Sequence, residues 1–138
     1  MSPLRFASPL VAALLLSATG CALGAPDSPL ANTSWRISTL DGQRPVSGSG
    51  KMDFRRSDIS VSIGCNSIGG AWRVEGDRLI AGPLMQTEMA CDTAIMRQED
   101  VLAALLVATP RMTLGGDRLT LQSSAHTVEL IRSGTLSR

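Results

Sequence analysis

The chain has 138 residues with 13 basic and 12 acidic side chains, so its net charge is close to zero. This length suits one domain. The balanced charge argues against a nucleic-acid-binding face, which needs an excess of Lys and Arg. Two Trp, two Phe and no Tyr leave few aromatic platforms on which bases or sugars could stack. We therefore expect one small domain that does not bind nucleic acid.

The first residues have the pattern of an export signal. Arg5 precedes an apolar stretch, residues 6–16, that is too short to span a bilayer as a helix but suits a secretory signal. Small residues then lead to Cys21, an arrangement that resembles the bacterial lipobox, where the signal is cut and the cysteine is acylated. We expect residues 1–20 to be a lipoprotein signal peptide and Cys21 to be the lipidation site. The alternative is ordinary cleavage beyond Cys21, which would leave a soluble periplasmic protein.

The predicted lipid sets the expected location. A lipid-modified cysteine with two or more acyl chains anchors a protein stably to a membrane. Ala22 follows the cysteine and lacks the aspartate that holds many lipoproteins in the inner membrane. We therefore expect an outer-membrane lipoprotein of the bacterial cell envelope, facing the periplasm. Residues 21–32 contain two prolines and are predicted to be a tether.

The rest of the chain predicts short antiparallel strands separated by glycine and aspartate turns. Ile59, Val61 and Ile63 alternate with polar residues and share one face of a strand. A Gly-Asp-Arg-Leu phrase occurs at 76–79 and again at 116–119, and we interpret each as a hairpin turn. The predicted strands are 34–40, 51–54, 59–63, 69–74, 78–82, 111–114, 118–122 and 126–131.

One segment, residues 92–110, has helical character, because it is rich in helix formers and has no interior glycine or proline. Asp92 or Thr93 can cap its start. Its apolar residues at helical spacing are expected to face the sheet: Ile95, Leu102, Leu105 and Leu106. We predict one α-helix over about Thr93–Ala108, between the sixth and seventh strands. About eight strands and one helix predict a mainly β protein, a small antiparallel barrel that the helix plugs or flanks.

Three cysteines become two if Cys21 is lipidated or removed. Export places Cys65 and Cys91 in an oxidising compartment where disulfides persist, and we interpret them as a disulfide. The alternative is two small buried thiols that never bond. No nearby histidine completes a ligand set, so a metal site is not expected. The only histidine, His126, belongs to another hairpin, has no evident acidic partner in the sequence, and is interpreted as a strand-surface residue.

Several phrases of the chain resemble the META domain family, also called HslJ-like. The most specific are Gly64-Cys65-Asn66, Gly69-Gly70, Thr87, Met89-Ala90-Cys91 and Glu99. The resemblance implies a small lipocalin-like barrel with one helix, covering residues 33–132, with 133–138 as a C-terminal tail. Members are usually envelope lipoproteins or secreted proteins, linked to heat shock, antibiotic tolerance, and motility or virulence. The resemblance supplies no active site to carry over.

Five polar residues around the two cysteines are candidate binding residues: Asn66, Gln86, Thr87, Glu88 and Glu99. A disulfide would bring residues 86–88 beside the Cys65 loop. Each candidate has a structural alternative. Asn66 would bond its own turn, residues 86–88 would satisfy loop backbone, and Glu99 would edge the buried helix face and bond a loop amide or Arg73. Soft-metal capture by the methionines near Cys91 is disfavoured against flexible filling of the core.

The sequence has no nucleophile elbow, zinc-binding helix or paired-carboxylate pattern, so we predict no catalytic residues, no cofactor and no enzyme activity. The leading hypothesis is a monomeric, non-catalytic envelope lipoprotein that binds an envelope protein or component and supports stress tolerance. One alternative is a barrel that binds a small hydrophobic ligand, although the aliphatic interior positions favour a filled barrel. Another is an inhibitor or pilot-type lipoprotein, on fold analogy alone.

Overall fold

The computed structural model describes residues 28–137. The predicted signal peptide, Cys21 and the first part of the predicted tether lie outside the described residues. Within residues 28–137, no helix is long and apolar enough to cross a membrane.

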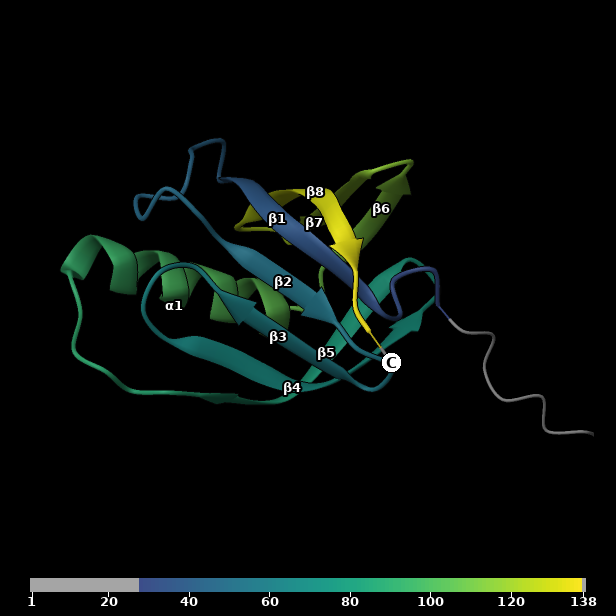
Figure 1. The fold of residues 1–138 in the computed structure, drawn as a ribbon, viewed down its shortest axis with the longest axis horizontal. Helices are drawn as coiled ribbons and strands as arrows, with labels where there is room; N and C mark the ends of the chain where they lie inside the picture. Colours follow the sequence, from purple (N-terminus) through teal and green to yellow (C-terminus); the bar gives the residue numbers. More distant parts are fainter. Residues whose placement is uncertain (1–27, 138) are drawn as a thin grey trace, which may run out of the picture.

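Eight antiparallel strands form a closed barrel in which neighbours in the sequence pair and β8 returns to pair with β1 (Figure 1). This confirms the predicted mainly β barrel with one helix. The elements are β1 (Thr33–Leu40), β2 (Lys51–Phe54), β3 (Asp58–Ser62), β4 (Ser67–Glu75), β5 (Arg78–Gln86), α1 (Thr93–Val107), β6 (Arg111–Gly115), β7 (Arg118–Gln122) and β8 (Thr127–Thr135).

The helix lies between β5 and β6, so its predicted place between the sixth and seventh strands was wrong. The strands predicted before residue 92 already number five, and the structure has the same five. Asp92 caps its start, because the carboxylate accepts the N–H of Ala94 at 2.9 Å. The helix ends at Val107, close to the predicted bound, and Thr109 takes a positive φ of 47° directly before Pro110. In Figure 1 the β5–α1 connection runs to one end of the molecule, and α1 returns alongside the barrel strands.

Both ends of the described chain belong to the folded barrel. Leu30, in the predicted tether, is fully buried in the core. At the other end β8 continues to Thr135 and pairs with Thr33 of β1. Leu136 then donates its N–H to the Asn32 carbonyl at 2.8 Å. Gly134 and Thr135, which fall in the predicted C-terminal tail, are thus part of β8 and pair with β1.

The interior of the barrel is filled by aromatic and aliphatic side chains. Trp35 and Phe54 are fully buried, and Phe54 meets Trp72 edge to face at a centroid distance of 5.0 Å. Ile59, Val61 and Ile63, the residues predicted to share one strand face, are also buried, as is Leu121 of β7. The helix adds Leu102, Leu105 and Leu106 to this core, while Ile95 is half-buried. Since the described interior is packed, binding sites are to be sought on the surface.

The barrel is joined unevenly around its circumference. Between β5 and β6 the ladder consists of one residue pair, Arg78 with Arg111. Two backbone hydrogen bonds flank it, from Leu79 to Pro110 at 3.0 Å and from Met112 to Asp77 at 2.6 Å. The later half of β5 therefore has β4 as its only strand partner, and α1 packs beside it.

Candidate functional site

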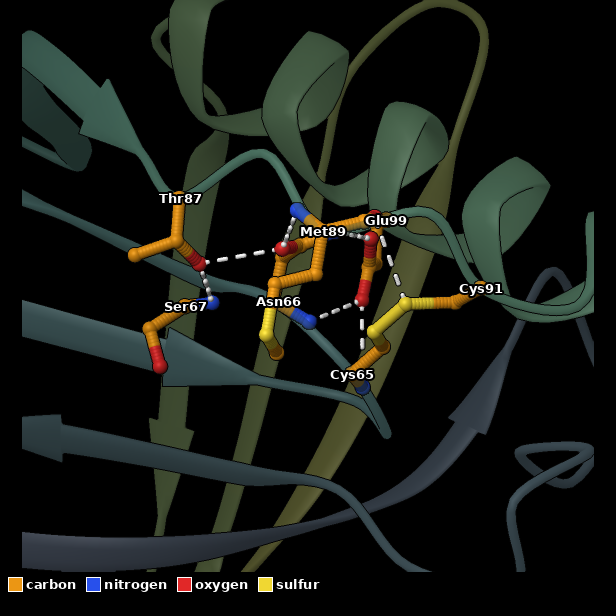
Figure 2. Close-up of a disulfide and its surroundings, with 7 residues drawn as sticks. All are labelled: Cys65, Asn66, Ser67, Thr87, Met89, Cys91 and Glu99. Carbon is orange, nitrogen blue, oxygen red and sulfur yellow. Dashed lines mark hydrogen bonds between the residues drawn. A yellow bond between two sulfur atoms is a disulfide. The ribbon is translucent and has the colours of Figure 1, made fainter.

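A disulfide joins the β3–β4 turn to the β5–α1 connection. Cys65 and Cys91 are bonded, with their Cα atoms 6.4 Å apart (Figure 2). The bond fixes the loop that carries Asn66 beside the connection from Gln86 to Cys91. The predicted candidate residues therefore come from three elements, and the structure brings them to one place.

Glu99 projects from α1 into this junction and is only 1% exposed. One carboxylate oxygen, Oε1, accepts the backbone N–H groups of Cys65 at 3.2 Å and Asn66 at 2.6 Å. The other, Oε2, accepts from the Asn66 side-chain nitrogen at 2.9 Å. A buried carboxylate needs such donors to offset its lost hydration. Of the structural alternatives for Glu99, the loop amide is the one present, and Arg73 instead pairs with Glu75.

Asn66 is 3% exposed and uses its whole side-chain amide within the protein. Its nitrogen donates to Glu99 and to the Met89 carbonyl, the latter at 3.2 Å. Its oxygen accepts from the Met89 N–H at 2.8 Å and the Thr87 hydroxyl at 3.1 Å. Two donors and two acceptor positions are all that an Asn side chain offers. The side chain therefore spans to the β5–α1 connection, rather than bonding its own turn, and has no free valence for a ligand.

Thr87 continues the network to β4. Its hydroxyl donates to Asn66 and accepts the Ser67 N–H at 3.0 Å, while its own N–H donates to the Ser67 carbonyl at 3.1 Å (Figure 2). The connection after β5 is thus held against the start of β4 by backbone and side-chain bonds together.

A surface pocket of about 440 Å³ opens over this network. Its lining residues are Asn66, Gln86, Thr87, Glu88, Met89, Ala90, Met96, Glu99 and Asp100. Met89 is 57% exposed and Met96 is 40% exposed, and Met85 nearby in sequence is 81% exposed. The expectation that these methionines fill the core was wrong: the aliphatic and aromatic side chains already fill it. Among residues 28–137, no three His, Cys, Asp or Glu side chains are grouped so as to hold a metal ion.

The META domain model matches residues 28–135 of the chain. The chain belongs to the META domain family. No curated protein sequence matches this chain. Two solved structures resemble this META domain. One, an NMR structure of a protein, has a TM-score of 0.69 and 20% identity over 78% of this chain and 94% of the other. The second, an NMR structure of a protein from Burkholderia xenovorans, has a TM-score of 0.62 and 21% identity over 96% of this chain and 99% of the other.

At 20% and 21% identity these two structures show a shared fold alone. The META domain family is not known as an enzyme family. Within this META domain the five candidate residues fall into two groups. Asn66 and Glu99 are buried and form the frame, and the Thr87 hydroxyl donates to Asn66. Gln86 and Glu88 are exposed at the pocket and are free to contact another molecule. Met89 and Met96, which sequence reasoning did not select, add exposed thioether side chains to the same pocket.

A polar pair outside this site, which the sequence did not predict, joins the residue after β1 to the residue before β8. His126 Nδ1 lies 2.8 Å from Asp41 Oδ2, and Asp41 Oδ1 accepts the Thr127 N–H at 2.9 Å. Burial acts to raise the pKa of Asp41, but the hydrogen bonds from Thr127 and His126 and the charge of His126 together hold it below its usual value. His126 thus has an acidic partner and lies just before β8, which corrects its interpretation as a partnerless strand-surface residue. The pair depends on β8 closing against β1, which no local pattern reveals.

Proposed function

We propose that this META domain is a non-catalytic binding module of the bacterial envelope, anchored at the outer membrane through Cys21 and facing the periplasm. In this proposal the module binds an envelope protein or component and supports tolerance of heat or antibiotic stress. The family membership and the export pattern of the first 21 residues support the location.

The pocket above the disulfide is the observation that carries the binding proposal. Its frame is fixed by the Cys65–Cys91 bond and by the Asn66–Glu99 hydrogen bonds. Its rim carries side chains exposed to solvent, Glu88 and Met89 among them. Recognition usually resides on loops that a rigid scaffold positions, and exposed methionines adapt to apolar surfaces of different shape. The packed interior of the described barrel speaks against the alternative of a small hydrophobic ligand held inside it.

Complementation of a deletion strain tests the binding site. We expect the deletion to cause sensitivity to heat or to hydrophobic antibiotics, and the wild-type gene to restore growth. A Glu88→Ala, Met89→Ala double variant keeps the backbone bonds of Met89 to Asn66 and should restore growth poorly while its melting temperature stays unchanged.

The matched control is an Asp117→Ala, Val107→Ala double variant, which removes one acidic and one apolar exposed side chain outside the pocket. It should restore growth fully. Full rescue by the folded Glu88, Met89 variant would argue against the pocket. Reproducible turnover of an envelope substrate by the purified protein would argue against a non-catalytic role.

Fractionation tests the anchor separately. The wild-type protein should be found with membranes, whereas Cys21→Ser should accumulate as an uncleaved precursor or as a soluble form. Wild-type protein found wholly in the soluble periplasm would contradict lipidation at Cys21.

A further inference from the structure

A second surface cleft, of about 480 Å³, lies on the outer wall of the barrel and shares no lining residue with the pocket over the disulfide. It is lined by Arg36, Ser49, Gly50, Lys51, Ser62, Gly64 and Ser133. These residues come from β1, β2, β3, β8 and the loops beside them, and the first three of these strands lie side by side in Figure 1. The lining contains two cations and no acidic or aromatic side chain.

The two cations face each other directly across neighbouring strands. Arg36 and Lys51 are partners in the β1–β2 ladder, and Lys51 is the partner of Ser62 in the β2–β3 ladder. Directly opposed residues point to the same side of a sheet, and both cations are exposed on the outer side. Like charges in this arrangement destabilise a sheet. The stability of the barrel therefore does not explain why both Arg36 and Lys51 are present.

Only one of the two cations is neutralised by a neighbour. Lys51 Nζ lies 2.7 Å from Asp53 Oδ2, and Ser34 donates to the other oxygen of that carboxylate at 2.6 Å. Within the described residues, Arg36 has no carboxylate within ion-pair distance and no side-chain hydrogen bond. The unpaired guanidinium of Arg36 therefore gives the cleft its net positive charge.

Hydroxyl groups complete the donor set. Within residues 28–137, the side chains of Ser49 and Ser62 take part in no hydrogen bond, and Ser133 donates to Ser34 at 3.2 Å. Gly50 and Gly64 contribute only backbone to the lining. A guanidinium fork, an ammonium group and neutral hydroxyl donors are the groups that bind phosphate oxygens, and the cleft volume lies within the range of small-molecule sites.

We propose that this outer-wall cleft binds a phosphate ester, with the Arg36 guanidinium as its main contact and Lys51, Ser49 and Ser62 as further donors. This site is distinct from the pocket of the proposed function and goes beyond it. A soluble phosphate ester and the headgroup of an anionic lipid share the chemistry that the cleft recognises.

Titration of the purified, ¹⁵N-labelled protein with glycerol 3-phosphate tests the site. Chemical-shift changes should concentrate on Arg36, Lys51, Ser49, Ser62 and Gly64, and glycerol itself should produce none. Vesicles of phosphatidylglycerol, compared with phosphatidylcholine, identify the source: binding that requires phosphatidylglycerol and Arg36 indicates a headgroup, and ester binding without vesicle binding indicates a soluble ester.

An Arg36→Glu variant separates loss of binding from loss of fold. Its carboxylate would face Lys51 and replace a repulsive pair with an attractive one, so the melting temperature at low salt should hold or rise. Affinity for glycerol 3-phosphate should fall by at least about tenfold, as expected for loss of a charge-assisted contact. Arg56→Glu, an equal charge change at an exposed turn outside the cleft, is the control and should keep the affinity.

Two results would overturn the proposal. One is a shift map that avoids the cleft or shows no change. The other is equal affinity of Arg36→Glu and wild type for both glycerol 3-phosphate and phosphatidylglycerol vesicles.

Discussion

Replacing Glu99 with Ala would test how the frame of the candidate pocket is held. The substitution removes the acceptor of three hydrogen bonds, two from backbone N–H groups and one from the Asn66 side chain. The Asn66 N–H and one of its side-chain hydrogens would then be buried without a partner. The Cys65 N–H is closer to solvent and can be hydrated.

The cost follows from these two orphaned donors. A buried donor left without its partner destabilises a protein by about 1–3 kcal/mol, so Glu99→Ala should lower the free energy of unfolding by about 2–6 kcal/mol. For a domain of this size, 1 kcal/mol corresponds to about 4 °C in melting temperature, which gives a decrease of at least about 8 °C. Glu99→Gln should lie between, at about 1–3 kcal/mol, because its amide oxygen can still accept the backbone donors while its NH₂ faces that of Asn66.

Thermal and urea unfolding of the oxidised protein would measure these differences. Asp100→Ala, at the next and exposed helix position, is the control and should change stability by no more than about 0.5 kcal/mol. If Glu99→Ala also remained within about 0.5 kcal/mol of wild type, the hydrogen bonds at the junction would not be what holds it.

Three further predictions concern other parts of the fold. Replacing Cys65 and Cys91 with Ala should lower the free energy of unfolding by about 3–4 kcal/mol through the regained entropy of the open loop, and an unchanged urea midpoint would contradict this. Because folding lowers the pKa of Asp41, its charge contributes stability that is present above its unfolded pKa of 3.8 and is lost as the pH falls through the folded pKa. Unfolding measured across that range should show a shallower acid loss for Asp41→Asn, and identical pH profiles would count against the pair. Gly70→Ala should lower the free energy of unfolding by about 3 kcal/mol or more, because its Cβ would collide with the Pro83 carbonyl of β5. Gly115→Ala, whose Cβ meets nothing within 4 Å, is the control and should be nearly neutral in the same unfolding assay.

Local patterns were enough to predict most of the barrel. The alternation of Ile59, Val61 and Ile63 gave a strand with the correct buried face, and repeated glycine-aspartate turns gave the hairpins. The patterns did not reveal where β5 ends. Gly82 and Pro83 interrupt it and the residues after them show no alternation, yet pairing with β4 continues it to Gln86.

The sequence predicted which loops meet at the candidate site, but not the hydrogen bonds that hold them together. The two cysteines indicated which loops would meet, but burial of Asn66 depends on its bonds to residues more than 20 positions away. A signal for Glu99 was present, since it precedes Leu102 by three positions and Leu106 by seven, on the buried face of the helix. A carboxylate on such a face requires donors, but which loop supplies them is decided only by the assembled barrel.

The single-pair seam between β5 and β6 gives the barrel an uneven resistance to opening. Elsewhere around the ring, separating two strands breaks a ladder of several residue pairs, but at the seam it breaks only one and the bonds beside it. Local fluctuations in a folded protein are least costly where few backbone bonds are lost. The start of β5 can therefore separate from β6 at little cost, while β6 stays paired with β7 and β8 stays paired with β1. Such an opening leaves β5 paired with β4 and joined to the β3–β4 turn by the disulfide, because these links all lie on the β5 side of the seam.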